Sequence, residues 1–191
     1  VISTNSVAYG VWASSAQVQL SSVNVDAGGN IWTAGVRISS WSAVSYSSVS
    51  VLDAHGFWLD SATATTVAFS TAVSNSPTGY TVYLKGGKNN VITGLFARNA
   101  NSSGYGLFIQ DSDTNTVTQS YLLGGDRGAD LDAGADYNVI SLSTMIGNSS
   151  IGLVANGADS NTVTGSYMWG GSYGVDLIAG SDSNVISFST M

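Results

Sequence analysis

Aspartate is the residue whose spacing in this chain could support chemistry, because the 191 residues include no glutamate, no cysteine and one histidine. Asp130, Asp132 and Asp176 occupy positions that a repeating fold would bring to one face. Two carboxylates on one face can act as the acid and the base of a glycosidase. These three are therefore the candidate catalytic residues. The interpretation we favour is that Asp130 and Asp176 are copies made by an internal duplication and that the chain has no catalytic centre.

A second aspartate series has a regular spacing of 23 residues and stands two residues before an equally regular asparagine. Carboxylates stacked at strand spacing repel one another unless each caps its own turn or a cation lies between them. We favour an Asx-type turn at each position. The alternative is a calcium ladder, and calcium is the only cofactor that the sequence suggests. The candidate ligands are Asp113, Asp136, Asp159 and Asp182.

The basic residues offer little to complete an acid–base pair. His55 lies in DAHGFW, where Asp53 is the nearest carboxylate in the sequence. We do not expect Arg37, Arg98 or Arg127 to lie beside an acidic cluster on a neighbouring coil. A catalytic role for His55 is therefore not predicted.

The elements that hold these residues follow from a repeat of about 23 residues. Residues 115–145 match residues 161–191 at 21 of 31 positions, so a unit of 46 residues was duplicated. Weaker copies of the phrase begin at Thr65, Ser42 and Ala16 and give eight rungs at intervals of 26, 23, 25, 25, 23, 23 and 23. Stacked asparagine amides can form a hydrogen-bonded ladder along such a repeat. The predicted structural ladder is Asn90, Asn115, Asn138, Asn161 and Asn184.

Within each unit the hydrophobic period is two, which is typical of strands. One strand begins with glycine, as in GVRI at Gly35 and GLFI at Gly106, and another reads SYLL, STMI or SYMW. Three short strands per unit indicate an all-β right-handed parallel β-helix of about eight coils with 23–26 residues per coil. We expect one domain over residues 1–191, irregular over 1–78 and regular over 79–191. Because no polar cap follows the last phrase, we expect a segment of a longer protein.

Alternation directs the variable residue of each glycine-led strand outward. Large exposed apolar surfaces usually mark interfaces, so this column is the candidate binding surface. Another copy, or the remainder of a longer chain, is the expected partner, through this aromatic face or end to end. A polysaccharide platform and cover by the molecule's own loops are the alternatives. The binding candidates are Trp12, Arg37, Trp58, Tyr83 and Phe108.

Composition excludes some partners. The formal net charge is −7, which disfavours nucleic acid, and no apolar run approaches the length of a membrane-spanning helix. The absence of cysteine removes disulfides and thiolate metal sites. We expect an extracellular or cell-surface location. The outward pairs Thr116/Thr118 and Thr162/Thr164 resemble those of ice-binding solenoids, although valine and serine interrupt the array.

The phrase DSNTVTGSYMWGGSYGVDL resembles the coils of right-handed β-helix repeat proteins, namely the pectate-lyase-like superfamily and its NosD-type surface relatives. The resemblance is clear over residues 79–191. It implies a lyase, a hydrolase, an adhesin or a fibre, but the NTD, DD, GHG and RIK motifs of the family's enzymes are absent. We therefore expect a non-catalytic structural or adhesive module of a large surface or filament-forming protein. An acidic-polysaccharide-active enzyme or glycan-binding β-helix is the alternative, and an ice-binding protein the third.

Overall fold

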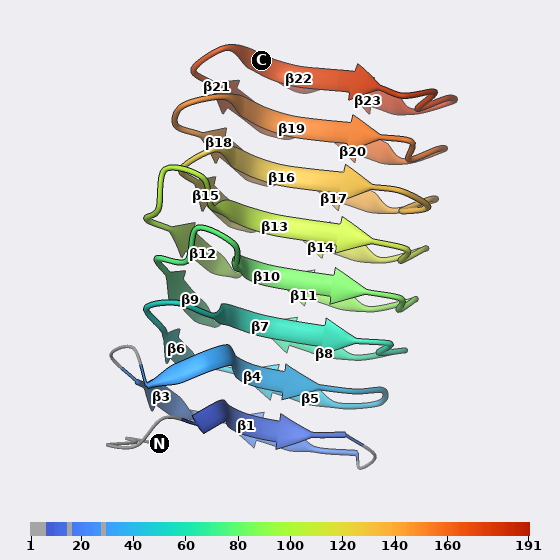
Figure 1. Ribbon diagram of the computed structural model, residues 1–191. Coiled ribbons are helices and arrows are strands. Elements are labelled where there is room, and N and C mark those ends of the chain that lie inside the picture. Colours follow the sequence, from blue (N-terminus) through green and yellow to red (C-terminus); the bar gives the residue numbers. More distant parts are fainter. Residues whose placement is uncertain (1–6, 15–16, 28–29) are drawn as a thin grey trace.

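The chain winds into a parallel β-solenoid whose coils stack along one axis (Figure 1). The computed structural model describes residues 7–14, 17–27 and 30–191. Three parallel sheets run along the solenoid, and the all-β fold predicted from the 23-residue repeat is confirmed. Over these described ranges there is no helix, and hence none long and apolar enough to cross a membrane.

Sheet 1 contains the longest strands and includes the glycine-led phrases of the sequence. Each strand pairs in parallel with the corresponding strand of the next coil. Its eight strands are β1 (Val7–Ala13), β4 (Ile31–Ile38), β7 (His55–Asp60), β10 (Tyr80–Lys85), β13 (Tyr105–Gln110), β16 (Arg127–Asp132), β19 (Ile151–Asn156) and β22 (Tyr173–Ile178).

Sheet 2 consists of three-residue strands, each following an asparagine or its equivalent. Its eight strands are β2 (Gln19–Ser21), β5 (Ala43–Ser45), β8 (Thr66–Ala68), β11 (Val91–Thr93), β14 (Thr116–Thr118), β17 (Val139–Ser141), β20 (Thr162–Thr164) and β23 (Val185–Ser187). Sheet 3 comprises β3 (Asn24–Asp26), β6 (Ser48–Ser50), β9 (Thr71–Ser74), β12 (Phe96–Asn99), β15 (Tyr121–Gly124), β18 (Thr144–Gly147) and β21 (Tyr167–Gly170). The third strand of each unit therefore lies where the sequence predicts it.

The register of sheet 2 corrects one predicted interval. Leu20 pairs with Val44, so the first two rungs are 24 residues apart and not 26. The predicted rung begins at Ala16, which is outside the described residues. Val18 and Leu20 both satisfy the alternation, and a shift by two residues keeps the same side chains facing inward. Hydrophobic pattern alone therefore cannot distinguish the two registers.

Close packing between sheets 1 and 3 requires glycine early in the sheet 1 strands. A Cβ atom on Gly128 would lie 2.4 Å from the backbone nitrogen of Ile146 and 2.6 Å from the carbonyl oxygen of Gly152. Both neighbours are backbone atoms, so a side chain could be accepted only if strands moved. Alternate residues beyond the glycine, such as Leu107 and Ile109, are buried in the core.

Candidate functional site

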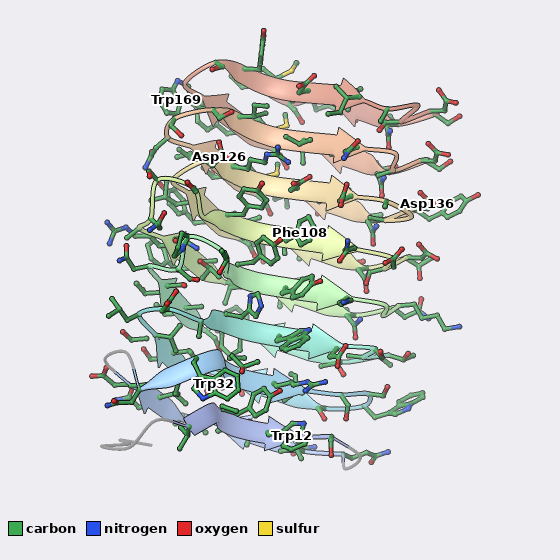
Figure 2. All side chains as sticks on the ribbon, viewed as in Figure 1. Trp12, Trp32, Phe108, Asp126, Asp136 and Trp169 are labelled. Atoms are coloured by element: carbon green, nitrogen blue, oxygen red, sulfur yellow. The ribbon has the colours of Figure 1, made fainter. Side chains whose placement is uncertain are left out.

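The outward column of sheet 1 places the predicted binding residues and two candidate catalytic residues in one row. Consecutive coils pair through these positions, and the row begins at Trp12 and passes Phe108, both labelled in Figure 2. In order, it consists of Trp12, Arg37, Trp58, Tyr83, Phe108, Asp130, Val154 and Asp176.

Arg37 is engaged within the first coils. Its guanidinium forms an ion pair with Asp60, and its Nη1 donates to the Tyr9 hydroxyl at 2.7 Å. The guanidinium carbon lies 4.4 Å from the centroid of the Trp58 ring and 5.7 Å from that of Trp12. Such contacts hold a cation against aromatic faces. The charge of Arg37 is therefore balanced inside the molecule.

The middle of the row is covered, which corrects the expectation of an exposed aromatic surface. Tyr83 is 7% exposed and Phe108 is 6% exposed. Tyr80 lies 4.2 Å from Phe108 and Tyr105 lies 6.0 Å from it, measured between ring centroids. Burial raises the pKa of Tyr83 to about 12. Three interpretations of this row were a protein interface, a polysaccharide platform and cover by the molecule's own loops. Tyr83 and Phe108 are covered by the molecule itself, but by side chains of the same sheet and not by loops.

The orientation of these rings also decides whether the row could bind a polysaccharide. Trp58 and Tyr83 stack at 5.7 Å with 19° between their planes, and Tyr83 and Phe108 stack at 5.5 Å with 29°. Rings stacked along the solenoid axis turn their faces toward one another and their edges toward solvent. A sugar ring packs on an aromatic face, so this part of the row presents little surface of the required kind.

Arg127 lies beside two carboxylates of its own coil, whereas the expectation concerned acidic clusters on neighbouring coils. Its Nη1 donates to Asp130 Oδ2 at 2.5 Å, and its Nε lies 3.6 Å from Asp126 Oδ2. Asp130 is only 2% exposed. Burial raises the pKa of Asp130 to about 6, even though Arg127 acts to lower it. The Oδ1 atom of Asp130 is buried without a hydrogen-bond partner in the described part of the chain.

The three candidate catalytic aspartates share the outer face of sheet 1 but do not form an open pair. Asp132 Oδ1 accepts a hydrogen bond from Asn156 Nδ2 at 2.7 Å. Asp176 is two coils from Asp130, with Val154 between them, which corresponds to about 10 Å at parallel-strand spacing. Because Asp130 is enclosed, a polymer in solvent would not reach its carboxylate in this arrangement.

His55 packs as an aromatic residue beside the same row. Its Nδ1 accepts a hydrogen bond from the backbone nitrogen of Tyr80 at 2.9 Å. The ring centroid lies 5.1 Å from that of Tyr83. Burial lowers the pKa of His55 to about 4, so the ring is neutral at physiological pH. Asp53 instead accepts a hydrogen bond from Ser76 Oγ.

The predicted asparagines form one column, buried except at Asn184, but the bonds differ in kind from the predicted ladder. From Asn115 onward, the side-chain Oδ1 of each asparagine accepts the backbone N–H of the asparagine in the preceding coil, at 2.7–2.9 Å. Amide-to-amide bonds link only the first three members, at 3.0 Å. The column thus ties side chain to backbone from coil to coil through Asn90, Asn115, Asn138, Asn161 and Asn184.

The second aspartate series also joins coils, which corrects the expectation that each carboxylate caps its own turn. Asp113 Oδ1 accepts the backbone N–H of Asp136 at 3.1 Å. Asp136 and Asp159 accept those of Asp159 and Asp182, both at 2.7 Å. Asp136 projects from a turn at one edge of the solenoid (Figure 2). Within the described ranges no three His, Cys or Asp residues group closely enough to suit a metal ion.

A surface hollow that sequence reasoning missed lies where sheet 1 turns into sheet 2 in the first coils. Its volume is about 530 Å³, and its lining includes Trp41, Asp60 and several serines. Trp41 is 63% exposed and has a φ of +62°, a left-handed conformation that is rare for a bulky residue. In the sequence, the only indication of this hollow was a tryptophan among serines. The hollow itself is formed by the stacking of three turns, which the sequence does not reveal.

Comparison with family models agrees with the architecture. A family model described as "Right handed beta helix region" matches residues 30–191. A candidate glycosyl hydrolase from Parabacteroides merdae has a similar structure, with a TM-score of 0.48 and 10% identity over 82% of this chain and 77% of that one. The endo-xylogalacturonan hydrolase from Aspergillus tubingensis gives a TM-score of 0.36 and 12% identity, covering 93% of this chain and 63% of its own. No curated protein sequence matches significantly.

Proposed function

The chain belongs to the right-handed β-helix family, and from that premise we propose that it is a non-catalytic structural or adhesive module of a large extracellular surface or filament-forming protein. Family membership alone does not select this role, because one architecture supports many activities. The proposal therefore rests on what the candidate functional side chains do in this chain.

One observation carries the proposal: most of the aspartates that could do chemistry, although not Asp176, are engaged in contacts within the solenoid. The aspartates of the turn series accept backbone N–H groups from the next coil. Asp130 is sealed against Arg127, and Asp132 bonds to the next coil through Asn156. A general acid or base must instead reach the substrate atom whose proton it transfers. These contacts favour a structural role.

A depolymerisation assay tests this function. The chain is incubated with pectin, alginate and other acidic glycans, with and without calcium, and new reducing ends and unsaturated products are measured. We expect no turnover above the substrate blank. Turnover that Asp130→Asn abolishes, in a variant with unchanged circular dichroism, would establish the enzyme and refute the structural module.

The hollow beside Trp41 favours carbohydrate binding as a second candidate function. Its volume lies within the 300–1,000 Å³ range of small-ligand sites. Trp41 offers an exposed ring and the serines offer hydroxyl groups, while the charge of Asp60 is balanced by Arg37. With a net charge of −7 on the chain, uronic acids would be repelled. The hollow therefore suits a neutral sugar.

A glycan array tests the second candidate. We expect binding to neutral glycans, reduced at least about tenfold by Trp41→Ala, since a lost stacking contact of about 1.4 kcal/mol is a factor of ten. Trp169→Ala is the matched control because Trp169 is also exposed, at 44%, but lies on β21 far along the axis. Equal loss in both variants, or none in either, would remove the hollow as a sugar site.

A further inference from the structure

One long side of the solenoid carries no charge. It is made of the first and third residues of every sheet 2 strand, the residue that follows each of these strands, and the first residue of each sheet 3 strand; we name it the uncharged face. All of these positions are described, and none of the chain's 12 aspartates and five basic residues occupies them. Sheet 1, in contrast, carries charged residues on five of its eight strands.

The edge of the uncharged face between sheets 2 and 3 holds apolar side chains in a strained backbone. Tyr46, Phe69 and Leu142 have φ values of +49°, +47° and +50°, where glycine or asparagine is usual. These side chains are 54–66% exposed. Strain of this kind often persists where a side chain has a function.

The same edge has glycines beside two of its large residues. A Cβ atom on Gly94 would lie 2.7 Å from the Phe69 ring, and one on Gly165 would lie 3.1 Å from Leu142. The side chains of Phe69 and Leu142 therefore lean toward the glycine of the next coil. The result is a ridge of unequal height, whose positions in coil order are Ser22, Tyr46, Phe69, Gly94, Gln119, Leu142, Gly165 and Phe188. A second copy of the chain presents the same surface, and a two-fold interface is formed by the same surface of both copies.

The distribution of charge indicates where two copies of the chain can meet. The net charge of −7 makes two copies repel wherever their carboxylates face each other. The uncharged face is a side on which two copies can meet without bringing an ion out of water, and the aspartates of the turn series lie at its border. Eight rungs at about 4.8 Å and a width of about 15 Å give about 500 Å² per partner, or roughly 1,000 Å² in total. That area is at the lower limit for a specific interface, so the contact is weak and reversible.

We propose that the uncharged face is a self-association surface through which two copies pack sheet 2 against sheet 2. The proposal deepens the structural function, on which it rests, by naming the partner as a second copy. Flat sheet faces pack about 10 Å apart, and the threonine, serine and valine side chains that predominate on the sheet 2 strands allow such an approach. The side chains of Tyr46 and Phe69, stacked at 5.5 Å, would be covered at its edge.

Sedimentation velocity over about 1–500 µM protein tests the proposal, a range suited to an interface of this size. We expect a reversible monomer–dimer equilibrium. Thr116→Arg with Thr162→Arg places two cations on the face, on the fifth and seventh of its eight strands, and should weaken dimerisation at least about tenfold. The matched control is Ser102→Arg with Ser103→Arg, in an exposed turn between sheets 3 and 1. Both variants change the net charge equally, and circular dichroism checks the fold.

Salt provides a second readout. Repulsion between acidic copies is screened as ionic strength rises, so association of the unchanged chain should tighten between about 20 and 300 mM NaCl. A chain that stays monomeric throughout overturns the proposal, as does a dimer that the threonine substitutions leave unchanged. A monomer that inhibits ice recrystallisation, with loss in the threonine variant, assigns the face to ice and also overturns it. Glycan turnover would refute the structural function without changing these results.

Discussion

At the scale of single residues, burial acts on Asp130 and His55 with opposite consequences for stability. The pKa of Asp130 is raised from 3.8 to about 6, so the folded chain binds the extra proton between those values. The pKa of His55 is lowered from 6.5 to about 4, so the unfolded chain binds the extra proton there. Stability contributed by Asp130 falls as pH rises through this window, and that contributed by His55 rises. The two effects offset each other.

Replacing Asp130 with asparagine removes the contribution to stability that falls as pH rises. Asparagine keeps an oxygen toward Arg127 but does not titrate. The free energy of unfolding of the variant, minus that of the unchanged chain, should therefore increase by about 1–3 kcal/mol between pH 4 and pH 6. Urea unfolding at several pH values measures the difference. A difference that is independent of pH would mean that Asp130 is not held in an enclosed site.

For His55→Asn, the difference in the free energy of unfolding from the unchanged chain should change with pH in the opposite direction. Asparagine retains an acceptor for the backbone N–H of Tyr80, which His55 Nδ1 occupies now. Relative to the unchanged chain, the variant should lose about 1–3 kcal/mol of stability between pH 4 and pH 6.5, because the unchanged chain gains it over that range. The double variant with Asp130→Asn is the control, and its difference curve should show little slope. Parallel curves for His55→Asn and the unchanged chain would contradict the low pKa.

At the scale of the elements, coil stacking depends on side-chain oxygens that accept backbone N–H groups. Asn138 accepts the N–H of Asn115 at 2.9 Å and donates from Nδ2 to the Ser112 carbonyl at 2.9 Å. Asn138→Leu would leave both groups buried without partners and should destabilise the fold by about 2–4 kcal/mol. Tyr137→Leu, at the exposed neighbouring position, should have little effect. If Asn138→Leu and Tyr137→Leu lowered the denaturation midpoint equally, the loss of stability would not come from the asparagine column.

The glycines of sheet 1 control how closely its strands approach sheet 3. Gly128→Ala forces backbone atoms apart, because its Cβ would lie within 2.4–2.7 Å of three of them. We expect a loss of about 3 kcal/mol or more. Gly180→Ala is the matched control: its φ is +76° and its Cβ would meet nothing within 4 Å, so only the left-handed backbone is penalised, by about 1 kcal/mol. Similar losses in thermal unfolding would argue against tight packing at Gly128.

At the scale of the whole molecule, excess negative charge should limit stability at low salt. The turn series places one carboxylate per coil along one edge, and Asp136 lies within that series. We expect the melting temperature to rise with NaCl, and Asp136→Asn, which keeps an acceptor oxygen for Asp159, to reduce that rise. Thermal unfolding in NaCl measures both. If calcium bound the series, low concentrations of it would raise the melting temperature far more than magnesium does.

Much of the architecture could be predicted from the sequence, since the period of 23 residues and the alternation along each strand are local patterns. The contacts of Arg127 could not. Strict alternation places residues three apart on opposite faces, but the sheet 1 ladder passes over Gly128 between Arg127 and Ala129, which leaves Arg127 beside Asp130. Tyr80 and Tyr105, which cover Tyr83 and Phe108, stand before the repeated phrase and carried no signal.

The ridge between sheets 2 and 3 has a consequence for how such a chain can lengthen in evolution. Leu142 leans toward Gly165, and the corner after that glycine is again large, at Phe188. A copy of a single coil would place two corners like Leu142 next to each other, whereas a copy of two coils, such as the 46-residue duplication, keeps a smaller residue between them. Adjacent large corners are accommodated elsewhere by stacking, at Tyr46 and Phe69. Each such event adds about 10 Å of length and reuses side-chain contacts that had already been selected.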